Sequence, residues 1–382
     1  MNRRVTPLAI LAAAAVLMYA PAAALAANFS WTGTAARNPE EDNWSNPANW
    51  EGTVPTGSVG RLTFAARPEP PCGEQPGEVL ACYLSKNDIS GLAVNAISID
   101  DGVPYLLSGN PISLGAGGVT ASPSASDPRR GAVPQLELPI VLTAPQTWSI
   151  AGGHGQQLGV DGGVSGASEN LGIHFRDSGF LNLSSDVEVG RVSISAAGRL
   201  AGGLSLAAPP GNKTPPSLNG ADGHPVDVKG ANLSAFGAGS TVGPLTMSSG
   251  HLQVGQGYPP NGTLTVAGSL NLGSRASLFL YVDSSGTIPG TDFSQLRVAG
   301  TARLHGAHLR LAGGSSHPGG RSCAGLRTGV TYPLIKASRG LRGRFHGIPD
   351  GATIPLQFCS GSVAPNVRIT YRRHAVVATV QR

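Results

Sequence analysis

The side chains that could carry out acid–base chemistry are few and scattered in this sequence. Asp and Glu together number 22 among 382 residues, and their densest groups are Glu40-Glu41-Asp42 and Asp100-Asp101. Glycoside hydrolases and polysaccharide lyases need carboxylates, or a basic side chain beside metal-binding acids, that converge on one bond. Adjacent acids of this kind are typical of solvated loops, so we predict no catalytic residue. Two carboxylates that converge from distant segments are the alternative, and they would make the protein a carbohydrate-active enzyme.

Histidine and glycine motifs also predict neither a metal site nor a cofactor site. His305 and His308 are three residues apart, which places them on opposite faces of a strand and makes them poor joint metal ligands. The sequence contains no Gly-x-Ser-x-Gly, no phosphate loop, no Gly-x-Gly-x-x-Gly and no His-Glu-x-x-His. We therefore expect no cofactor and no metal.

Tryptophan could contribute binding instead of catalysis. Trp31, Trp44 and Trp50 lie close together in the sequence. An exposed indole can stack on a sugar ring, because it offers a large apolar face with a polar edge. Large aromatic side chains are more often buried, so we favour a role in covering the end of a core. Glycan contact by these three residues is the alternative.

The four cysteines predict two disulfides if the chain is exported. They are Cys72, Cys82, Cys323 and Cys359, and proximity in the sequence favours the pairs Cys72–Cys82 and Cys323–Cys359 among three possible arrangements. A structural metal site would need close spacing such as Cys-x-x-Cys, which is absent.

The N-terminus indicates export. Arg3 and Arg4 precede an apolar run that ends at Ala24-Leu25-Ala26, so residues 1–26 are predicted to be a cleaved signal peptide. No later segment has the length of a membrane span. We expect an extracellular or cell-surface protein without a membrane span after cleavage.

Charge argues against nucleic acid as a partner. The formal charge of +5 falls to +3 once Arg3 and Arg4 are removed with the signal peptide. Nucleic-acid binding needs a clustered basic face. A set of arginines near the C-terminus is a candidate patch for an anionic cell-wall polymer or polysaccharide, although such residues also keep edge strands soluble. The set is Arg339, Arg342, Arg344, Arg368, Arg372 and Arg373.

Composition and periodicity predict the elements that must position these residues. The 54 glycines and 30 prolines disfavour helices, whereas 40% hydrophobic residues disfavour disorder. From about residue 90 to 311, apolar residues recur two apart in short runs such as Leu136, Leu138, Ile140 and Leu142, which is typical of strands with one buried face. Strands this short are stable only when they stack on one another, so we predict an all-β protein in the form of a β-solenoid. A sandwich of two sheets is the rival fold.

Four segments follow from this interpretation. Residues 1–26 are the signal peptide, 27–89 a Trp-rich N-terminal cap with a disulfide loop, 90–311 the solenoid, and 312–382 a C-terminal β cap or small β-subdomain. Caps are expected because both ends of a solenoid expose unpaired backbone and apolar core.

Several short sequence segments resemble those of one family of exported bacterial proteins. They include Trp31-Thr32-Gly33, the segment 43–50 with Val54-Pro55, Gln146-Thr147-Trp148, and, in the same order as in the family, segments 262–270, 293–300, 340–345 and 369–371. They are similar to proteins with autotransporter-associated β-strand repeats. The resemblance implies a right-handed parallel β-helix outside the cell, in a family whose roles are mostly adhesive or unassigned. The sequence departs from autotransporters in lacking the long alternating strands of a C-terminal translocator barrel.

The sequence therefore favours a secreted or cell-surface structural or adhesive β-solenoid that performs no catalysis. Its expected partner is an extracellular polysaccharide or another cell-surface ligand. The alternatives are a carbohydrate-active β-helix enzyme, which would show acids lining a cleft, and a carbohydrate-binding protein that uses the N-terminal tryptophans.

Overall fold

Strands account for nearly all regular structure in the part of the chain that is described. The computed structural model describes residues 26–34, 42–65, 84–100, 105–122, 134–152, 157–197, 202–207, 214–255, 262–283, 286–313, 323, 326–359 and 365–381. Within these ranges there are 28 strands and one short 3-10 turn, η1(Pro47–Asn49), and no α-helix. The all-β prediction is confirmed over these residues. Residues 1–25 of the predicted signal peptide, Cys72 and Cys82 lie outside them.

The strands pair in three parallel ladders, because each turn of the chain places its segments beside those of the turn before. The first ladder contains β1(Ala27–Trp31), β2(Ser58–Phe64), β4(Leu92–Ile99), β6(Ile112–Ala121), β9(Gln146–Gly152), β11(Val164–Asp177), β13(Val187–Ala197), β16(Val226–Phe236), β18(Leu245–Val254), β20(Leu270–Val282), β22(Ala302–Arg303) and β25(Leu341–Arg342).

The second ladder joins β3(Leu84–Asn87), β5(Leu106–Gly109), β7(Gln135–Leu136), β10(Gln157–Val160), β12(Phe180–Leu183) and β14(Gly203–Ala207) to the later halves of β16, β18 and β20 and to β23(His308–Gly313). The third ladder joins the first residues of β2 and the first halves of β4, β6, β11 and β13 to β8(Ile140–Leu142), β15(Ser217–Leu218), β17(Ala238–Val242), β19(Thr263–Val266), β21(Gln295–Val298) and β24(Thr331–Ala337).

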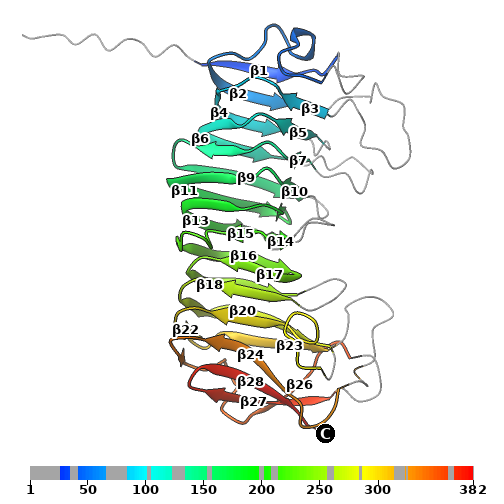
Figure 1. The fold of residues 1–382 in the computed structure, drawn as a ribbon, viewed down its shortest axis with the longest axis vertical. Helices are drawn as coiled ribbons and strands as arrows, with labels where there is room; N and C mark the ends of the chain where they lie inside the picture. The colour runs from blue at the N-terminus through cyan, green and yellow to red at the C-terminus, as the bar shows by residue number, and fades with distance from the viewer. Residues whose placement is uncertain are drawn as a thin grey trace, which may run out of the picture.

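Successive turns of the chain stack along the long axis of the molecule, with the N-terminal strands at one end (Figure 1). The inward side chains are aligned from one turn to the next. In the second ladder one column is Leu107, Leu136, Val160, Leu183, Leu206, Ala235, Val254, Leu280 and Leu311, all buried. Alternation with period two puts these residues inside and their neighbours outside, and stacking converts short apolar pairs into one continuous core.

Tight corners between the ladders explain part of the glycine content. Gly152, at the end of β9, approaches the backbone of Gly179, just before β12, so closely that a Cβ on Gly152 would collide with it. Any other residue at this point would push the two turns apart and break their pairing. Glycine is therefore required here by the spacing between turns of the chain.

The C-terminal end changes from parallel to antiparallel pairing. Strand β24 pairs antiparallel with β28(Ala375–Val380), which pairs with β27(Asn366–Arg372), which in turn pairs with β26(Thr353–Pro355). These strands lie at the opposite end of the molecule from β1 (Figure 1). Arg368 and Arg372 lie on β27, and Arg373 lies in the turn between β27 and β28.

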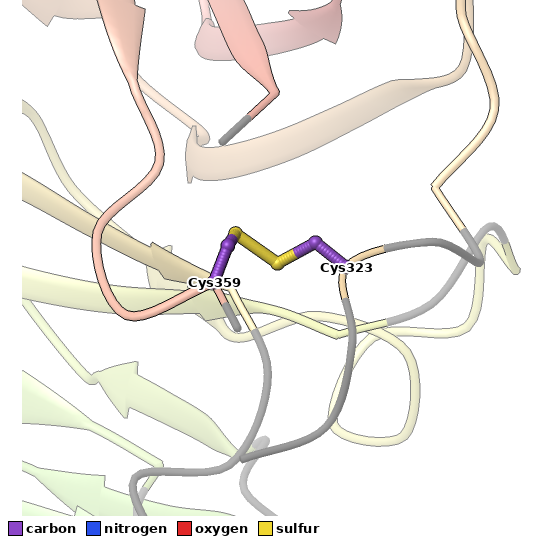
Figure 2. The surroundings of a disulfide bond; sticks show 2 residues. All are labelled: Cys323 and Cys359. Atoms are coloured by element: carbon purple, nitrogen blue, oxygen red, sulfur yellow. A yellow bond between two sulfur atoms is a disulfide. The ribbon is translucent and has the colours of Figure 1, made fainter. Parts of the chain in front are cut away.

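A disulfide joins Cys323 to Cys359, the pairing that proximity in the sequence favoured, with their Cα atoms 5.4 Å apart (Figure 2). It lies against the end of β23, where the Gly313 N–H donates to the Gln357 carbonyl at 2.9 Å. A side chain at Gly313 would collide with both sulfur atoms. The bond therefore fixes the segment before β24 to the segment after β26.

Candidate functional site

A column of small polar side chains runs along the outer surface of the first ladder. Inward residues of these strands, such as Leu62, Ile97 and Trp148, are buried, so the residues between them point outward. Strand register aligns the outward residues from turn to turn. The aligned set is Ser30, Thr63, Ser98, Thr120, Ser149, His174 and Ser195. We call this set the hydroxyl column.

The hydroxyl column presents a regular row of hydrogen-bonding groups to solvent. Each member is partly exposed. Paired strands are about 4.8 Å apart, so the hydroxyls repeat at roughly that spacing. The described residues offer no side-chain hydrogen bond to Ser30, Thr63, Thr120 or Ser149. Each of these hydroxyls can both donate and accept, as can the hydroxyls of a sugar.

Three members of the hydroxyl column have side-chain partners within the fold. Ser98 Oγ donates to Asp100 Oδ1 at 2.7 Å, and His174 Nδ1 lies 3.0 Å from Ser195 Oγ. These bonds hold three of the seven members in a defined geometry. Beyond Ser195 the same register position is filled by Lys229, Ser249 and Arg275, so the surface becomes basic toward the C-terminal end.

One pair of carboxylates is brought together in the middle of the stack. Glu137 and Asp161 each directly follow a strand, β7 and β10, and the register of those strands places Leu136 beside Val160. Burial raises the pKa of both carboxyl groups, and the negative charge of Asp161 raises the pKa of Glu137 further. A sequence signal existed, since each acid follows an apolar strand end, but only the register shows that the two are neighbours.

Of the acids singled out in the sequence, the two that the structure describes, Asp42 and Asp100, have other surroundings. Asp42 is buried, its carboxyl pKa is raised by desolvation, and the Lys86 N–H donates to its carbonyl at 2.9 Å. Asp100 accepts from Ser98, as described above. Glu40, Glu41 and Asp101 lie outside the described residues.

The three N-terminal tryptophans are interior residues. Trp31, Trp44 and Trp50 are 3%, 0% and 4% exposed. Trp44 Nε1 donates to Ser85 Oγ at 2.7 Å, and Trp50 Nε1 donates to the Trp44 carbonyl at 2.8 Å. Edge-to-face contacts, including 5.0 Å between the rings of Trp31 and Trp50, pack the three together. Their ring faces are thus covered by protein, and stacking on a sugar would first require this cluster to open.

The histidines do not assemble a metal site in the described part of the chain. No group of three or more His, Cys, Asp or Glu side chains is arranged there to hold an ion. His305 occupies a turn with φ 39°, whereas His308 lies on β23 with its ring 5.0 Å from that of His346.

The C-terminal arginines are exposed and belong to several elements. Arg344 lies over the ring of Tyr371, 5.8 Å from its centre. Arg368 and Arg372 are on β27, on the antiparallel end of the molecule. Arg339, Arg342 and Arg373 are neighbours, because the Leu341 N–H donates to the Arg373 carbonyl at 2.8 Å.

Comparison with known proteins adds no relative: no protein-family model, curated protein or solved structure matches this chain. Among the described residues, no helix has the length and apolar character needed to cross a membrane.

Proposed function

We propose that this protein is a non-catalytic adhesive or structural rod, exported by a bacterium through a cleaved signal peptide and displayed outside the cell. Its fold would be the right-handed parallel β-helix of proteins with autotransporter-associated repeats. The tryptophan cluster would cap one end and the antiparallel strands the other. The sequence segments that resemble this family and the stacked parallel ladders support this proposal.

The observation that carries the proposal is the hydroxyl column. Six hydroxyl side chains and one imidazole repeat along a single face that the backbone holds rigid. An extended polysaccharide lying along this face would meet one donor–acceptor group per turn of the chain. Each hydrogen bond contributes only about 0.5–1.5 kcal/mol, so affinity would come from the number of contacts. The ligand class that fits is therefore an extended extracellular polysaccharide.

The test is binding of purified protein to a panel of cell-wall and extracellular polysaccharides. In the column variant, Thr63→Val, Thr120→Val and Ser149→Ala remove three hydroxyls and keep similar side-chain shapes. In the matched control, Ser58→Ala, Ser113→Ala and Ser165→Ala remove three hydroxyls from the outer face of the third ladder, where these serines share one register position. We expect affinity to fall about tenfold or more in the column variant, because three hydrogen bonds are lost together. Affinity of the control should stay unchanged.

Equal binding by the column variant and the control would refute the role of the hydroxyl column. Both variants should keep the far-ultraviolet circular dichroism of the parent, because none of the six positions faces the core. That measurement separates loss of contact from loss of fold.

A carbohydrate-active enzyme is the second candidate, favoured by the pair Glu137 and Asp161. Two neighbouring carboxyl groups of raised pKa can share the roles of acid and base toward a glycosidic bond. Mass spectrometry of the same polysaccharides after incubation would show cleaved or unsaturated sugars, and Glu137→Gln and Asp161→Asn would each abolish them. Such products would overturn the non-catalytic proposal.

A further inference from the structure

The positive charge of this protein is concentrated at its C-terminal end. Residues 295–382 contain 13 of the 27 Lys and Arg residues but a single acid, Asp350. Their formal charge is therefore +12, and the remaining residues carry −7, which together give the +5 of the whole chain. Such an imbalance within one molecule creates a strongly positive potential at one end of the rod.

Strand register gathers part of this charge on two successive turns of the chain. Arg297 on β21 pairs with Lys336 on β24, and Arg303 on β22 pairs with Arg342 on β25. Each pair is separated by one strand spacing of about 4.8 Å at the backbone. The two pairs flank the same corner, where the chain leaves the third ladder and enters the first.

Two more arginines complete the corner. Arg339 lies in the short connection between β24 and β25, where its N–H donates to the Gly300 carbonyl at 3.0 Å. Arg373 lies in the turn between β27 and β28, and its carbonyl accepts from the Leu341 N–H at 2.8 Å. The basic corner thus comprises Arg297, Arg303, Lys336, Arg339, Arg342 and Arg373. Arg303 is partly exposed and the other five are exposed.

The described fold supplies this corner with neutral partners only. Arg297 Nε donates to Gln295 Oε1 at 2.9 Å, and Arg303 Nη1 to Asn271 Oδ1 at 3.4 Å. Gln295 is buried and is itself held by the Pro333 carbonyl at 2.7 Å. Asp350, the single acid of residues 295–382, accepts instead from the Tyr371 N–H at 2.8 Å. In the described part of the chain, no carboxylate forms an ion pair with any of the six.

Like charges placed directly opposite each other on paired strands destabilise a sheet unless an ion of opposite charge lies between them. Two such pairs at one corner, in which neutral amides orient Arg297 and Arg303, form a surface that can bind several negative charges. We propose that the basic corner binds a polyanionic polysaccharide, with carboxylate or sulfate groups lying along Arg303–Arg342 and Arg297–Lys336. Arginine suits such groups because its planar fork can bind two oxygens at once.

Other polyanions fit this corner less well. Single-stranded nucleic acid binds on exposed aromatic platforms, whereas Tyr332 and Phe345 at this end are buried. The exposed Phe358 lies against Phe279 of the second ladder, and the corner lies between the third and first ladders. A lipid surface is held by apolar side chains beside the cations. The residues between the cations are small and polar or lack a side chain, as Gly300, Thr301 and Ser338 show. A repeating acidic sugar needs only the row of charges.

The test measures binding of the full chain to immobilised heparin and to polygalacturonate, one sulfated and one carboxylated polymer. The corner variant carries Arg297→Gln, Lys336→Gln, Arg339→Gln and Arg342→Gln. The control carries Arg61→Gln, Lys86→Gln, Arg176→Gln and Arg327→Gln, which remove the same charge from other exposed positions. This inference does not rest on the hydroxyl column, because none of these residues belongs to it.

We expect the corner variant to bind at least about tenfold more weakly than the control, since four cation–anion contacts disappear together. Binding of the parent should weaken about tenfold or more from about 0.05 M to 0.5 M NaCl, because salt screens exposed charges. Equal weakening of corner variant and control would overturn the proposal, since it would show general attraction to net charge.

Two further measurements distinguish a polysaccharide from other ligands of the basic corner. Preferential binding of the parent to phosphatidylglycerol vesicles or to single-stranded DNA, with neither polysaccharide bound, would replace the proposed ligand class. Salt-sensitive self-association seen by sedimentation, and lost in the corner variant, would assign the corner to a second copy of the chain. Either result would refute polysaccharide as the partner.

Discussion

The indole of Trp148 and the side chain of Gln146 should stabilise the stack jointly, and a double-mutant cycle can measure how much. Trp148 is fully buried, and its Nε1 donates to Gln146 Oε1 at 2.8 Å. Gln146 is 6% exposed, and its Nε2 donates to the Leu114 carbonyl at 3.1 Å, on the preceding turn of the chain. The two side chains therefore link one turn to the next through the core.

Each single change leaves the other partner buried and unpaired. Trp148→Phe leaves Gln146 Oε1 without a hydrogen-bond donor, and Gln146→Leu leaves Trp148 Nε1 without an acceptor. Each substitution should therefore lower the free energy of unfolding by about 1–3 kcal/mol. Trp148→Phe also loses some buried area. The Leu114 carbonyl remains hydrogen-bonded in both variants, because it still accepts from the Thr143 N–H at 2.9 Å and from the Thr143 hydroxyl at 3.1 Å.

The double variant should cost less than the two single variants together. It removes both polar groups, so neither is left unsatisfied, and we expect a coupling energy of about 1–2 kcal/mol. Urea unfolding followed by circular dichroism near 218 nm avoids the change in tryptophan fluorescence. Hydrogen exchange of β9 and β11 would localise the effect, since stacked turns of a chain can unfold in part. Additivity within about 0.5 kcal/mol would refute the linkage.

Two other predictions concern the C-terminal end. The pair of substitutions Cys323→Ser and Cys359→Ser opens a loop with a sequence separation of 36 residues, so the chain-entropy relation predicts a loss of about 4 kcal/mol. Hydrogen exchange should show the loss near β23 and β24, and unchanged protection there would contradict it. Burial, aided by the Asp292 carboxylate, raises the pKa of Tyr332 from 10.0 to about 12. Because the unfolded chain then loses this proton more readily, the stabilising contribution of neutral Tyr332 is complete below about pH 10 and is lost as the pH rises through about 12. Ultraviolet titration of the phenolate measures it, with Tyr332→Phe as the control, and a phenolate that forms near pH 10 in the folded protein would refute it.

The sequence alone determined the secondary structure class and most of the core. Pairs such as Leu136 and Leu138, or Leu278 and Leu280, alternate with polar residues, and they are buried as alternation requires. Glycine and proline removed helices from consideration for local reasons that do not depend on packing. Nearness along the chain favoured the link between Cys323 and Cys359 among three possible arrangements, and the structure confirms it.

The register of the strands could not be predicted from the sequence, because it depends on the number of residues in each corner between two strands. Nothing local indicates that Thr120 lies beside Ser98 and Ser149, that Glu137 lies beside Asp161, or that Arg303 lies beside Arg342. The six C-terminal arginines formed one group in the sequence, whereas the register of the strands places Arg342 beside Arg303 and brings in Arg297 and Lys336, which that group did not include.

The burial of the three N-terminal tryptophans was likewise decided by the tertiary structure. Their type allowed either a covered end or a sugar-binding surface, and only packing decided that Trp44 is enclosed by Trp50, Phe64 and Ser85. Local sequence specifies which residues prefer to be buried, since hydrophobicity and period belong to a few neighbours. Contacts between residues far apart along the chain are decided by the lengths of the turns and by the fit of the whole core, and these exist only in the folded molecule.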